Sequence, residues 1–598
     1  MFTRPDVHAT ELDGGGVLLA SRTPLGPLPR STSTFLTRWV VRDPDRPLFI
    51  EPDAAGGTEE RVVTYAGALA TARSIGQALL ARGLGPARGV AILSGNSIDH
   101  ALVTLAGALV GVPVVPISVA YSTRATDFSR LRDMLAVVQP GLVFCADPAA
   151  CPAALDAIAD LGAELVCATP ARDGRAHALL SELESTTATG AVDEAAAAVD
   201  LDTVAKVLFT SGSTGVPKGV PTTHRMLLAN QVALQQIWPF LAETPPVLVD
   251  WLPWSHTFGG SHNVGLVIAN GGTMVIDHGR PAPGLIDVTL ANVRRHRPTI
   301  SFNVPAGYAA LLPHLEADEE LAAAFFSRLQ LIFYAAAALP QDLWQRLEAV
   351  SERTTGRVVP MTSSWGSTET APLATAAHFP LERAGNIGVP VPGVELKLVP
   401  AGGKLEMRVR GPNVMTGYLG GRGPHDVPHP FDDDGFYRIG DAGRLADPDD
   451  PSAGILFDGR IAEDFKLTTG TWVSVGQLRV DALAAASPLL ADAVVTGHDR
   501  ESVGLLAWPA PTAAPDDPDV RRRITEGLAA HNAVAGGSSR IVTRVLLLTE
   551  PPSIDAGEIT DKGYINQRAV LERRAADVER LHAADPDADV LVIAPGGG

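Results

Sequence analysis

The sequence predicts an α/β protein in which largely parallel sheets are covered by helices. From Val62 onward, short apolar runs typical of buried strands alternate with stretches whose apolar residues recur at helical spacing. Residues 64–85 have the helical pattern and end on glycine, and residues 89–97 follow as a buried strand that runs into a turn. Alternation of this kind is typical of parallel strands joined by helices.

The pattern changes along the rest of the chain. After Asn386 the segments VELKLVP and KLEMRVRG alternate apolar and polar residues between turns, which predicts a small β-rich subdomain. Beyond Gly459 a shorter region has its own helix–strand alternation. The first forty residues, rich in Gly, Pro, Ser and Thr, are expected to wrap over the surface. The length of 598 residues fits several domains, since one domain takes roughly 150 residues.

The composition excludes several classes of protein. With 46% hydrophobic and 19% charged residues, the chain can build cores and is not disordered throughout. A formal charge of −19 does not suit a general nucleic-acid binder, which must neutralise phosphates. Three cysteines (Cys145, Cys151 and Cys167) make no disulfide framework, and no CxxC or His/Cys cluster suggests zinc. We interpret them as small buried residues in a reducing compartment.

One uncharged segment of twenty residues, 101–120, is long enough to be considered as a membrane span. Gly107, Gly111, Pro113 and Pro116 divide it into a helix-like half and a short β-rich half, which indicates a buried helix leading into a strand. The first residues lack the basic and then apolar order of a signal peptide. We therefore expect a cytoplasmic protein that does not interact with membranes.

The strongest local motif is VLFTSGSTGVPKGV, residues 207–220, in which an apolar strand precedes a loop rich in Ser, Thr and Gly. Backbone N–H groups and hydroxyls of such a loop can surround phosphate oxygens, and Lys218 adds a positive charge. The motif differs from GxxxxGK[ST], because Pro217 precedes the lysine and Gly219 follows it. A bare Gly/Ser loop could equally be a plain flexible turn. The ordered string TSGSTGxPKG, however, resembles the phosphate loop of the adenylate-forming superfamily, which includes acyl-CoA synthetases.

Further strings follow in the order of that superfamily. WLPWSHTFGG, residues 251–260, resembles its acyl-pocket segment with His256 as gate, although His256 taken alone would be read as a satisfied histidine. Tyr334 and the alanines after it match the segment on which adenine packs. SWGSTE, residues 364–369, resembles the string whose Thr meets phosphate and whose Glu binds Mg²⁺, which implies these roles for Thr368 and Glu369.

Two motifs and a lysine complete the resemblance, which covers residues 31–571. YRIGD, residues 437–441, resembles the string whose Asp binds the ribose hydroxyls, here Asp441, with Ile439 in place of the usual Thr. Gly459 and Arg460 match the pair that ends the large domain. Lys562 lies where the family has its catalytic lysine, although an isolated lysine in a polar stretch is normally just solvated.

The resemblance implies a fold, domains and sites. It implies a large N-terminal domain, 1–458, of two helix-covered mixed sheets plus a small β-barrel-like subdomain, and a smaller mobile α+β C-terminal domain, 459–598, that carries the catalytic lysine. The implied catalytic residues are Lys562, His256, Thr368 and Glu369, with Glu369 as metal ligand. The implied ATP site consists of Thr210, Ser211, Gly212, Ser213, Thr214, Gly215, Lys218, Ala335, Ala336, Ala337, Trp365, Gly366, Ser367, Thr368, Asp441 and Arg460. The implied acyl pocket consists of His256, Phe258, Gly259, Gly260, Asn303, Val304 and Tyr334, and the implied CoA channel of Lys466, Gly470, Thr471 and Trp472.

Departures from the wider family narrow the resemblance. The hinge slot holds Ala462, and Thr471, Val475 and Gln477 replace a usual Glu, Pro and Glu. Together with DAGEITDKGYINQR, these changes resemble the feruloyl-CoA synthase branch, whose members join hydroxycinnamate-type acids to CoA at the expense of ATP. The low charge of the pocket segments suits an aromatic acid, and the paired glycines are expected to make room for a flat ring.

The resemblance thus implies ATP, Mg²⁺ and coenzyme A as cofactors and a small carboxylic acid as substrate, in a monomer or homodimer. Two alternatives stay open. An adenylating enzyme could load a carrier protein or use another acyl acid, and a relative without activity could bind acyl groups or nucleotides only.

Overall fold

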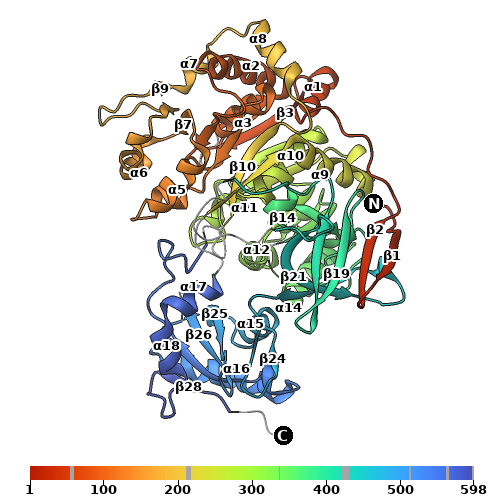
Figure 1. The fold of residues 1–598 in the computed structure, drawn as a ribbon, viewed down its shortest axis with the longest axis vertical. Helices are drawn as coiled ribbons and strands as arrows, with labels where there is room; N and C mark the ends of the chain where they lie inside the picture. The colour runs from red at the N-terminus through yellow and green to blue at the C-terminus, as the bar shows by residue number, and fades with distance from the viewer. Residues whose placement is uncertain are drawn as a thin grey trace.

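The apolar runs between residues 47 and 390 form the strands of three sheets, and helices cover those sheets (Figure 1). The structure is a computed structural model that describes residues 1–53, 59–210, 217–335, 337, 339–419, 430–510, 513–560 and 565–594. In Figure 1 the C-terminal part, coloured blue, lies at the opposite end of the molecule from α1 to α3.

The two larger of these sheets contain the predicted strand–helix alternation. One has seven strands in the order β11 (Lys218–Thr223), β10 (Val204–Thr210), β6 (Val114–Pro116), β5 (Val90–Ile92), β7 (Leu142–Cys145), β8 (Glu164–Cys167) and β9 (Ala178–Leu179). The other has five, β14 (Ile300–Asn303), β15 (Leu331–Tyr334), β16 (Met361–Gly366), β17 (Leu373–Ala376) and β18 (Val389–Pro390). Both are mixed, because β11, β17 and β18 pair antiparallel with their neighbours.

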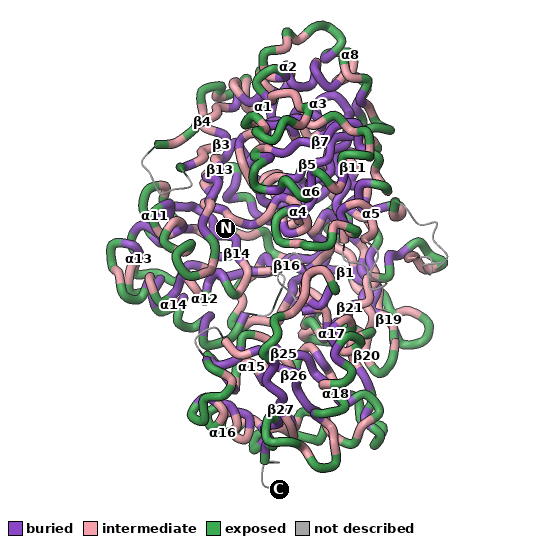
Figure 2. Tube along the Cα trace, turned by 90° about the vertical axis from the view of Figure 1, so that its left-hand side faces the viewer, coloured by how far each residue is buried: buried purple, intermediate pink, exposed green. Residues whose placement is uncertain are grey.

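A third, four-stranded sheet and a set of helices complete this region. The sheet runs β12 (Val247–Asp250), β13 (Thr273–Ile276), β3 (Pro47–Pro52) and β4 (Glu60–Thr64). The α-helices are α1 (Ser33–Arg42), α2 (Tyr65–Ala81), α3 (Ile98–Val110), α4 (Ala120–Thr123), α5 (Ser129–Val138), α6 (Pro152–Ala157), α7 (Leu180–Glu184), α8 (Gly190–Ala198), α9 (His224–Ile237), α10 (Val264–Ala269), α11 (Ile286–His296), α12 (Pro305–Ala317), α13 (Glu319–Phe326) and α14 (Gln341–Thr355). Buried segments run through the interior and exposed ones lie outside (Figure 2).

The uncharged segment 101–120 folds as a helix followed by a strand. Ser97 caps α3 by accepting a hydrogen bond from the His100 N–H, and Gly111 ends the helix in the left-handed conformation at φ 72°. The chain then enters β6, which lies between β10 and β5 inside the seven-stranded sheet. Within the described residues, no helix has the length and apolar character that a membrane crossing needs.

The β-rich subdomain is a six-stranded antiparallel sheet that includes the N-terminus of the chain. Its order is β1 (Val7–Leu12), β2 (Gly16–Ser21), β19 (Glu395–Ala401), β20 (Lys404–Arg410), β21 (Tyr437–Leu445) and β22 (Ile455–Arg460). The expectation that the first forty residues wrap over the surface is wrong for β1 and β2. Leu19 pairs with Leu396 and both are fully buried, so the first strands are part of this sheet and its core.

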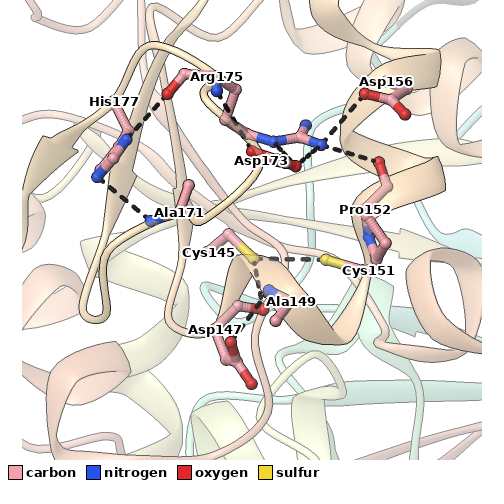
Figure 3. Close-up of polar contacts among 10 residues, drawn as sticks. All are labelled: Cys145, Asp147, Ala149, Cys151, Pro152, Asp156, Ala171, Asp173, Arg175 and His177. Carbon is pink, nitrogen blue, oxygen red and sulfur yellow. Dashed lines mark hydrogen bonds and ion pairs between the residues drawn. The ribbon is translucent and has the colours of Figure 1, made fainter.

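The three cysteines are buried and carry no disulfide. Figure 3 shows two of them, Cys145 and Cys151. Cys145 ends β7 and pairs in register with Cys167 on β8. The Sγ atoms of Cys145 and Cys151 lie 3.4 Å apart. Cys145 and Cys151 pack in one hydrophobic cluster, near which Arg175 pairs with Asp173 and with Asp156 of α6 (Figure 3).

The C-terminal part has a core of its own. It contains the short hairpin β23 (Phe465–Lys466) and β24 (Trp472–Val473) and the sheet β25 (Leu490–Thr496), β26 (Val503–Pro509), β27 (Val542–Leu547) and β28 (Val590–Val592). Its helices are α15 (Val475–Ala485), α16 (Pro518–Val534), α17 (Gln567–Arg573) and α18 (Ala575–Leu581). Residues of α15 and α16 share one hydrophobic cluster with strands of this sheet.

A buried ion pair supports the segment just before residues 561–564. The Glu558 side chain is 0% exposed and accepts hydrogen bonds from Arg574 Nε at 2.6 Å, from Arg573 and from the Ser553 N–H. The Asn566 N–H donates to the Glu558 carbonyl at 2.8 Å, which closes the loop from the other side. Glu558 therefore anchors both ends of the stretch that contains Lys562, which itself lies outside the described residues.

We expect Glu558→Ala to lower the free energy of unfolding of the C-terminal part by about 3–5 kcal/mol, because the buried Arg574 guanidinium loses its buried counter-charge and keeps only the exposed Glu550 carboxylate, 3.7 Å away. Urea denaturation followed by tryptophan fluorescence measures this, since Arg574 stacks on Trp508. Glu572→Ala is the matched control. It removes an exposed pair with Arg568 and should cost less than about 1 kcal/mol. Equal effects of the two substitutions would contradict the anchoring role.

Candidate functional site

The predicted phosphate loop lies between two paired strands. β10 ends at Thr210 and β11 begins at Lys218, and these two residues are cross-strand partners. Ser211, Gly212, Ser213, Thr214 and Gly215 lie outside the described residues. Because the strands pair up to their last residues, the positions of both ends of the predicted loop are defined.

Lys218 lies beside a polar cluster built from distant parts of the chain. Its Nζ is 5.3 Å from the centroid of the Tyr418 ring, a cation–π distance. The Tyr418 hydroxyl donates to Glu369 Oε1 at 2.7 Å. The Tyr437 hydroxyl oxygen lies 3.1 Å from the Tyr418 hydroxyl oxygen. Burial and then the neighbouring Glu369 raise the pKa of Tyr418, so the phenol stays protonated and can donate. The result is a buried carboxylate near a cation, with one oxygen held in place.

Glu369 is part of a short 3₁₀ turn, η5 (Thr368–Thr370), that follows β16. Thr368 and Glu369 are both buried, and the Met415 N–H donates to the Glu369 carbonyl at 2.9 Å. Two buried amides hold the end of the turn, since Asn230 and Asn413 both donate to the Thr370 carbonyl. Sequence reasoning missed Tyr418, Asn230 and Asn413, because their contacts join distant segments and no local motif marks them.

Asp441 stands opposite Arg460 on neighbouring strands. The two are register partners on β21 and β22, with Arg460 Nε 3.3 Å from Asp441 Oδ1. Trp365, in the slot where the family usually has Tyr, donates its indole N–H to Asp441 Oδ2 at 2.8 Å. Burial raises the pKa of Asp441, while Arg460 and Trp365 act in the opposite direction. Arg460 itself stays 63% exposed and can contact a ligand.

The predicted acyl segment enters a π-helical turn, η4 (Phe258–Asn263). His256 precedes it, and its carbonyl accepts a hydrogen bond from the Gly260 N–H. A Cβ at Gly259 would meet the carbonyl oxygens of Leu252 and Pro253, and one at Gly260 would meet that of Trp254. The glycines therefore allow close backbone packing, and this corrects the expectation that they make room for a ring.

A buried lysine holds the same turn. Lys206, on β10, is 7% exposed and donates from Nζ to the Gly260 carbonyl at 2.7 Å. Burial lowers the pKa of Lys206 to about 8. β10 therefore positions both the start of the predicted phosphate loop and the predicted acyl segment.

Phe258 and Tyr334, both predicted to line the acyl pocket, lie on opposite faces of the five-stranded sheet. Phe302 and Phe333 share a cluster with Phe258, and their rings are 6.1 and 5.6 Å from the Phe258 centroid. Tyr334, the next residue on β15, points to the opposite face and packs edge-on against Trp344. Asn303 Oδ1 accepts a hydrogen bond from the Val304 N–H at the start of α12. Phe302 and Phe333 thus meet Phe258, whereas Tyr334 does not.

The remaining predicted residues belong to the ATP site and to the CoA channel. Gly366 ends β16, and Ser367 follows it as the N-cap of η5. Lys466 Nζ stacks on the Trp472 ring at 5.0 Å in the β23–β24 hairpin, with Gly470 and Thr471 in its turn. Trp472 lies beside the Gly402 turn of β19 and β20, about 3.8 Å from where a Gly402 Cβ would be. Ala335 and Ala337 are described, whereas Ala336 is not.

No group of three or more His, Cys, Asp or Glu residues with metal-site geometry occurs in the part of the chain that the structure describes. A single carboxylate such as Glu369 is still a suitable Mg²⁺ ligand, because Mg²⁺ is commonly held by one or two carboxylates together with substrate phosphates. The Tyr418 hydroxyl hydrogen-bonds to Glu369 Oε1, and the Tyr437 phenol also interacts with this carboxylate.

Solved structures confirm the predicted fold class, with a large N-terminal and a smaller C-terminal domain. An anthranilate CoA ligase in complex with anthranoyl-AMP matches with a TM-score of 0.69 at 20% identity, over 92% of this chain and 98% of that chain. ATP-bound MatB from Rhodopseudomonas palustris matches with a TM-score of 0.66 at 23% identity, over 92% of this chain and 99% of that one. At these identities the likeness shows the fold alone.

The curated relatives include CoA ligases of several kinds, and an Arabidopsis thaliana relative is named as a long-chain-fatty-acid–[acyl-carrier-protein] ligase. A propanoyl:CoA ligase of Mycobacterium tuberculosis that acts on a methyl-dioxo-octahydroindenyl acid is 28% identical over 79% of this chain and 87% of its own. The 4-coumarate–CoA ligase 1 of Oryza sativa is 28% identical over 76% of this chain and 78% of its own. A feruloyl-CoA synthase of an Amycolatopsis species is 32% identical, over 44% of this chain and 53% of its own.

Family models match most of the chain. The AMP-binding enzyme model covers residues 36–419, and the model of the AMP-binding enzyme C-terminal domain covers residues 475–585. These matches confirm the predicted superfamily and, with the CoA ligases among the relatives, the predicted class of acid–thiol ligase. The chain belongs to the AMP-binding enzyme family.

Proposed function

We propose that the chain is an ATP-dependent aryl acid–CoA ligase that activates a hydroxycinnamate or a related aromatic carboxylate. The observation that carries the proposal is the convergence of Lys218 from β11, Glu369 from the turn η5, and Asp441 and Arg460 from β21 and β22. This set offers a cation and a carboxylate for a magnesium–triphosphate, and a second carboxylate beside an arginine for a ribose.

The first step would be attack of the substrate carboxylate on the α-phosphate of ATP. A carboxylate is a poor electrophile, and converting it to acyl-AMP supplies a leaving group while pyrophosphate departs. Charge accumulates on the α-phosphate in the transition state, where Lys218, Thr368, Lys562 and the loop amides would stabilise it. Asp441 would accept hydrogen bonds from the ribose hydroxyls, and Trp365 would orient it.

Magnesium would be held by Glu369, whose orientation the Tyr418 hydroxyl fixes. Mg²⁺ bound there would neutralise phosphate charge and polarise the phosphoryl oxygens. His256 is proposed to line the entrance for the acid.

The second step would be attack of the CoA thiol on the adenylate carbonyl, with AMP leaving. We propose that residues 459–598 act as the mobile domain, which would withdraw Lys562 and present the Lys466 and Trp472 hairpin to CoA. Their contacts with the larger part include two polar ones in addition to the Trp472 ring beside Gly402. Thr126 donates from Oγ1 to Asp555 at 2.7 Å, and Lys404 pairs with Asp464 near the junction. The Thr126–Asp555 hydrogen bond is exposed and contributes little, whereas Asp464 is only 3% exposed and its pair with Lys404 lies at the junction itself.

The aromatic preference has two supports. Phe258, Phe302 and Phe333 form an aromatic cluster at the predicted acyl segment, and rings of this kind favour a flat apolar substrate. Two relatives are named for feruloyl and 4-coumarate substrates. A cytoplasmic location goes with this proposal, because ATP and CoA are intracellular metabolites.

A pyrophosphate-release panel tests the proposal. With ATP and Mg²⁺, we expect cinnamates or benzoates to give higher kcat/KM than fatty acids, and mass spectrometry should detect the aryl-CoA only when CoA is added. Pyrophosphate release with no thioester would favour the carrier-loading alternative. ATP binding with no release for any acid would favour a non-catalytic relative.

Lys562→Ala separates the two half-reactions. We expect adenylate formation to fall by on the order of 10²–10³ because a charge stabiliser of the transition state is lost, while supplied acyl-AMP is still converted to the thioester. Rapid-quench assays of each half-reaction measure this. Lys466→Ala is the informative comparison, since it should affect only the second half-reaction. Survival of both half-reactions in Lys562→Ala would reject the catalytic role.

Asp441→Asn tests the ribose site. We expect the KM for ATP to rise about 10- to 100-fold with a smaller change in kcat, because hydrogen bonds to a charged acceptor are worth about 1.5–3 kcal/mol. Steady-state kinetics with ATP as the varied substrate give the two constants. Asp449→Asn, an exposed aspartate after β21, should leave both unchanged. An unaltered KM in Asp441→Asn would remove this residue from the site.

A further inference from the structure

A chain of three buried polar side chains crosses the predicted acyl region. Asp250, at the end of β12, accepts a hydrogen bond from Asn263 Nδ2 at Oδ2, 2.7 Å away, and its Oδ1 accepts the Leu252 N–H at 2.9 Å. Asn263 Oδ1 in turn lies 2.9 Å from His262 Nδ1. All three side chains are almost completely buried, with 0 to 2% exposed. The chain starts at a carboxyl group and ends at an imidazole.

The hydrogen-bond directions fix which imidazole nitrogen carries the proton. Asn263 donates its amide hydrogen to Asp250, so its amide oxygen is the atom that meets His262. An oxygen can only accept, which assigns the proton of a neutral ring to Nδ1. Burial lowers the pKa of His262 to about 4, so the ring is neutral at pH 7. Nε2 is therefore an acceptor with a lone pair.

That acceptor has no partner. Within the part of the chain that the structure describes, His262 Nε2 is buried and receives no hydrogen bond. Its surroundings are aromatic, because the ring centroids of Phe302, Phe333, Phe258 and Trp238 lie 5.1, 5.5, 5.8 and 6.5 Å from that of His262. Buried polar atoms in native proteins are almost always paired, so an unpaired one whose neighbour is firmly held indicates a missing donor.

We propose that His262 is a specificity-determining residue whose Nε2 accepts a hydrogen bond from a hydroxyl on the ring end of the aryl acid. The inference rests on the proposed function, since it assumes that the acid enters along the segment that carries His256 and Phe258. His262 lies six positions after His256 on this segment, a distance of about 9 Å or less at the α-helical rise. A substrate whose carboxylate lies near His256 can thus extend its ring toward His262.

The proposal selects one chemical class among aromatic acids. A ring that carries an O–H donor satisfies Nε2, whereas an unsubstituted ring leaves the lone pair unpaired. A methoxy group in place of the hydroxyl offers only acceptors and gains nothing. Sites that hydrogen-bond a substrate hydroxyl discriminate strongly against the analogue that lacks it, because the protein's own polar group is then left without a partner.

The experiment compares cinnamate, 4-hydroxycinnamate and 4-methoxycinnamate in the pyrophosphate-release assay. For the unaltered enzyme we expect kcat/KM for the hydroxy acid to exceed that for each of the other two by about 5- to 100-fold, mostly through KM. In His262→Phe, whose ring fits the aromatic cluster, this ratio should fall to about one while activity on cinnamate persists. His378→Phe is the matched control, because His378 is also a buried histidine but contacts Thr3 at the N-terminus, and it should keep the ratio.

The outcomes separate this inference from the proposed function. If the unaltered enzyme has equal kcat/KM for 4-hydroxycinnamate and cinnamate, the role of His262 is overturned and the aryl acid–CoA ligase function is not. This comparison does not depend on whether a variant folds. A ratio that survives in His262→Phe overturns the role of His262 as well. Preference of the unaltered enzyme for fatty acids over all three cinnamates rejects the proposed function and the inference together.

Discussion

The backbone bridge between Gly219 and Leu419 is the contact on which the arrangement of the site depends. It joins the edge strand of the seven-stranded sheet to the segment before the β-rich strand β21, with the Leu419 N–H donating to the Gly219 carbonyl at 2.8 Å. Lys218 and Tyr418 precede the two bridged residues, so the bridge also brings the ammonium group against the tyrosine ring. Through Tyr418 the position of Glu369 depends on the same contact.

Local charge, and not net charge, governs binding in this molecule. The chain has a formal charge of −19, and each of the proposed substrates, ATP, CoA and a carboxylate, is an anion. Net charge acts at long range and is screened beyond about 10 Å at 0.1 M salt, whereas a cation in a partly buried site acts on the ligand directly. Lys218 and the exposed Arg460 supply such cations, and a carboxylate stands close to each of them. With Mg²⁺ bound, the Glu369 carboxylate would hold the metal ion that attracts the phosphates, and its own charge would not repel them.

The sequence predicted those parts of the structure that depend on neighbouring residues. Alternating patterns located the strands of the two large sheets, and Gly111 marked the end of α3 within the uncharged segment. Contacts between distant residues could not be predicted in this way. The pairing of Leu19 with Leu396 is one example, because an alternating strand carries no information about its partner. Tyr334 illustrates the same limit within the candidate site, since its motif gave its position along the chain but not the face of the sheet on which it lies.

The polar groups near η4 show why aromatic packing alone is an incomplete description of the predicted acyl region. The ammonium group of Lys206, the carboxyl group of Asp250 and the imidazole of His262 are all buried around one π-helical turn. Burying each of these polar groups costs free energy that apolar side chains would not cost. Lys206 binds a backbone carbonyl of the turn, and Asp250 fixes the amide that orients His262. Because the hydrogen bonds from Asp250 through Asn263 hold the His262 ring, the ring cannot easily rotate to bring Nε2 to another partner. A rigid acceptor among aromatic rings favours a ligand with one donor in one position. The buried polar groups thus lower the stability of the fold but let the pocket select among similar rings.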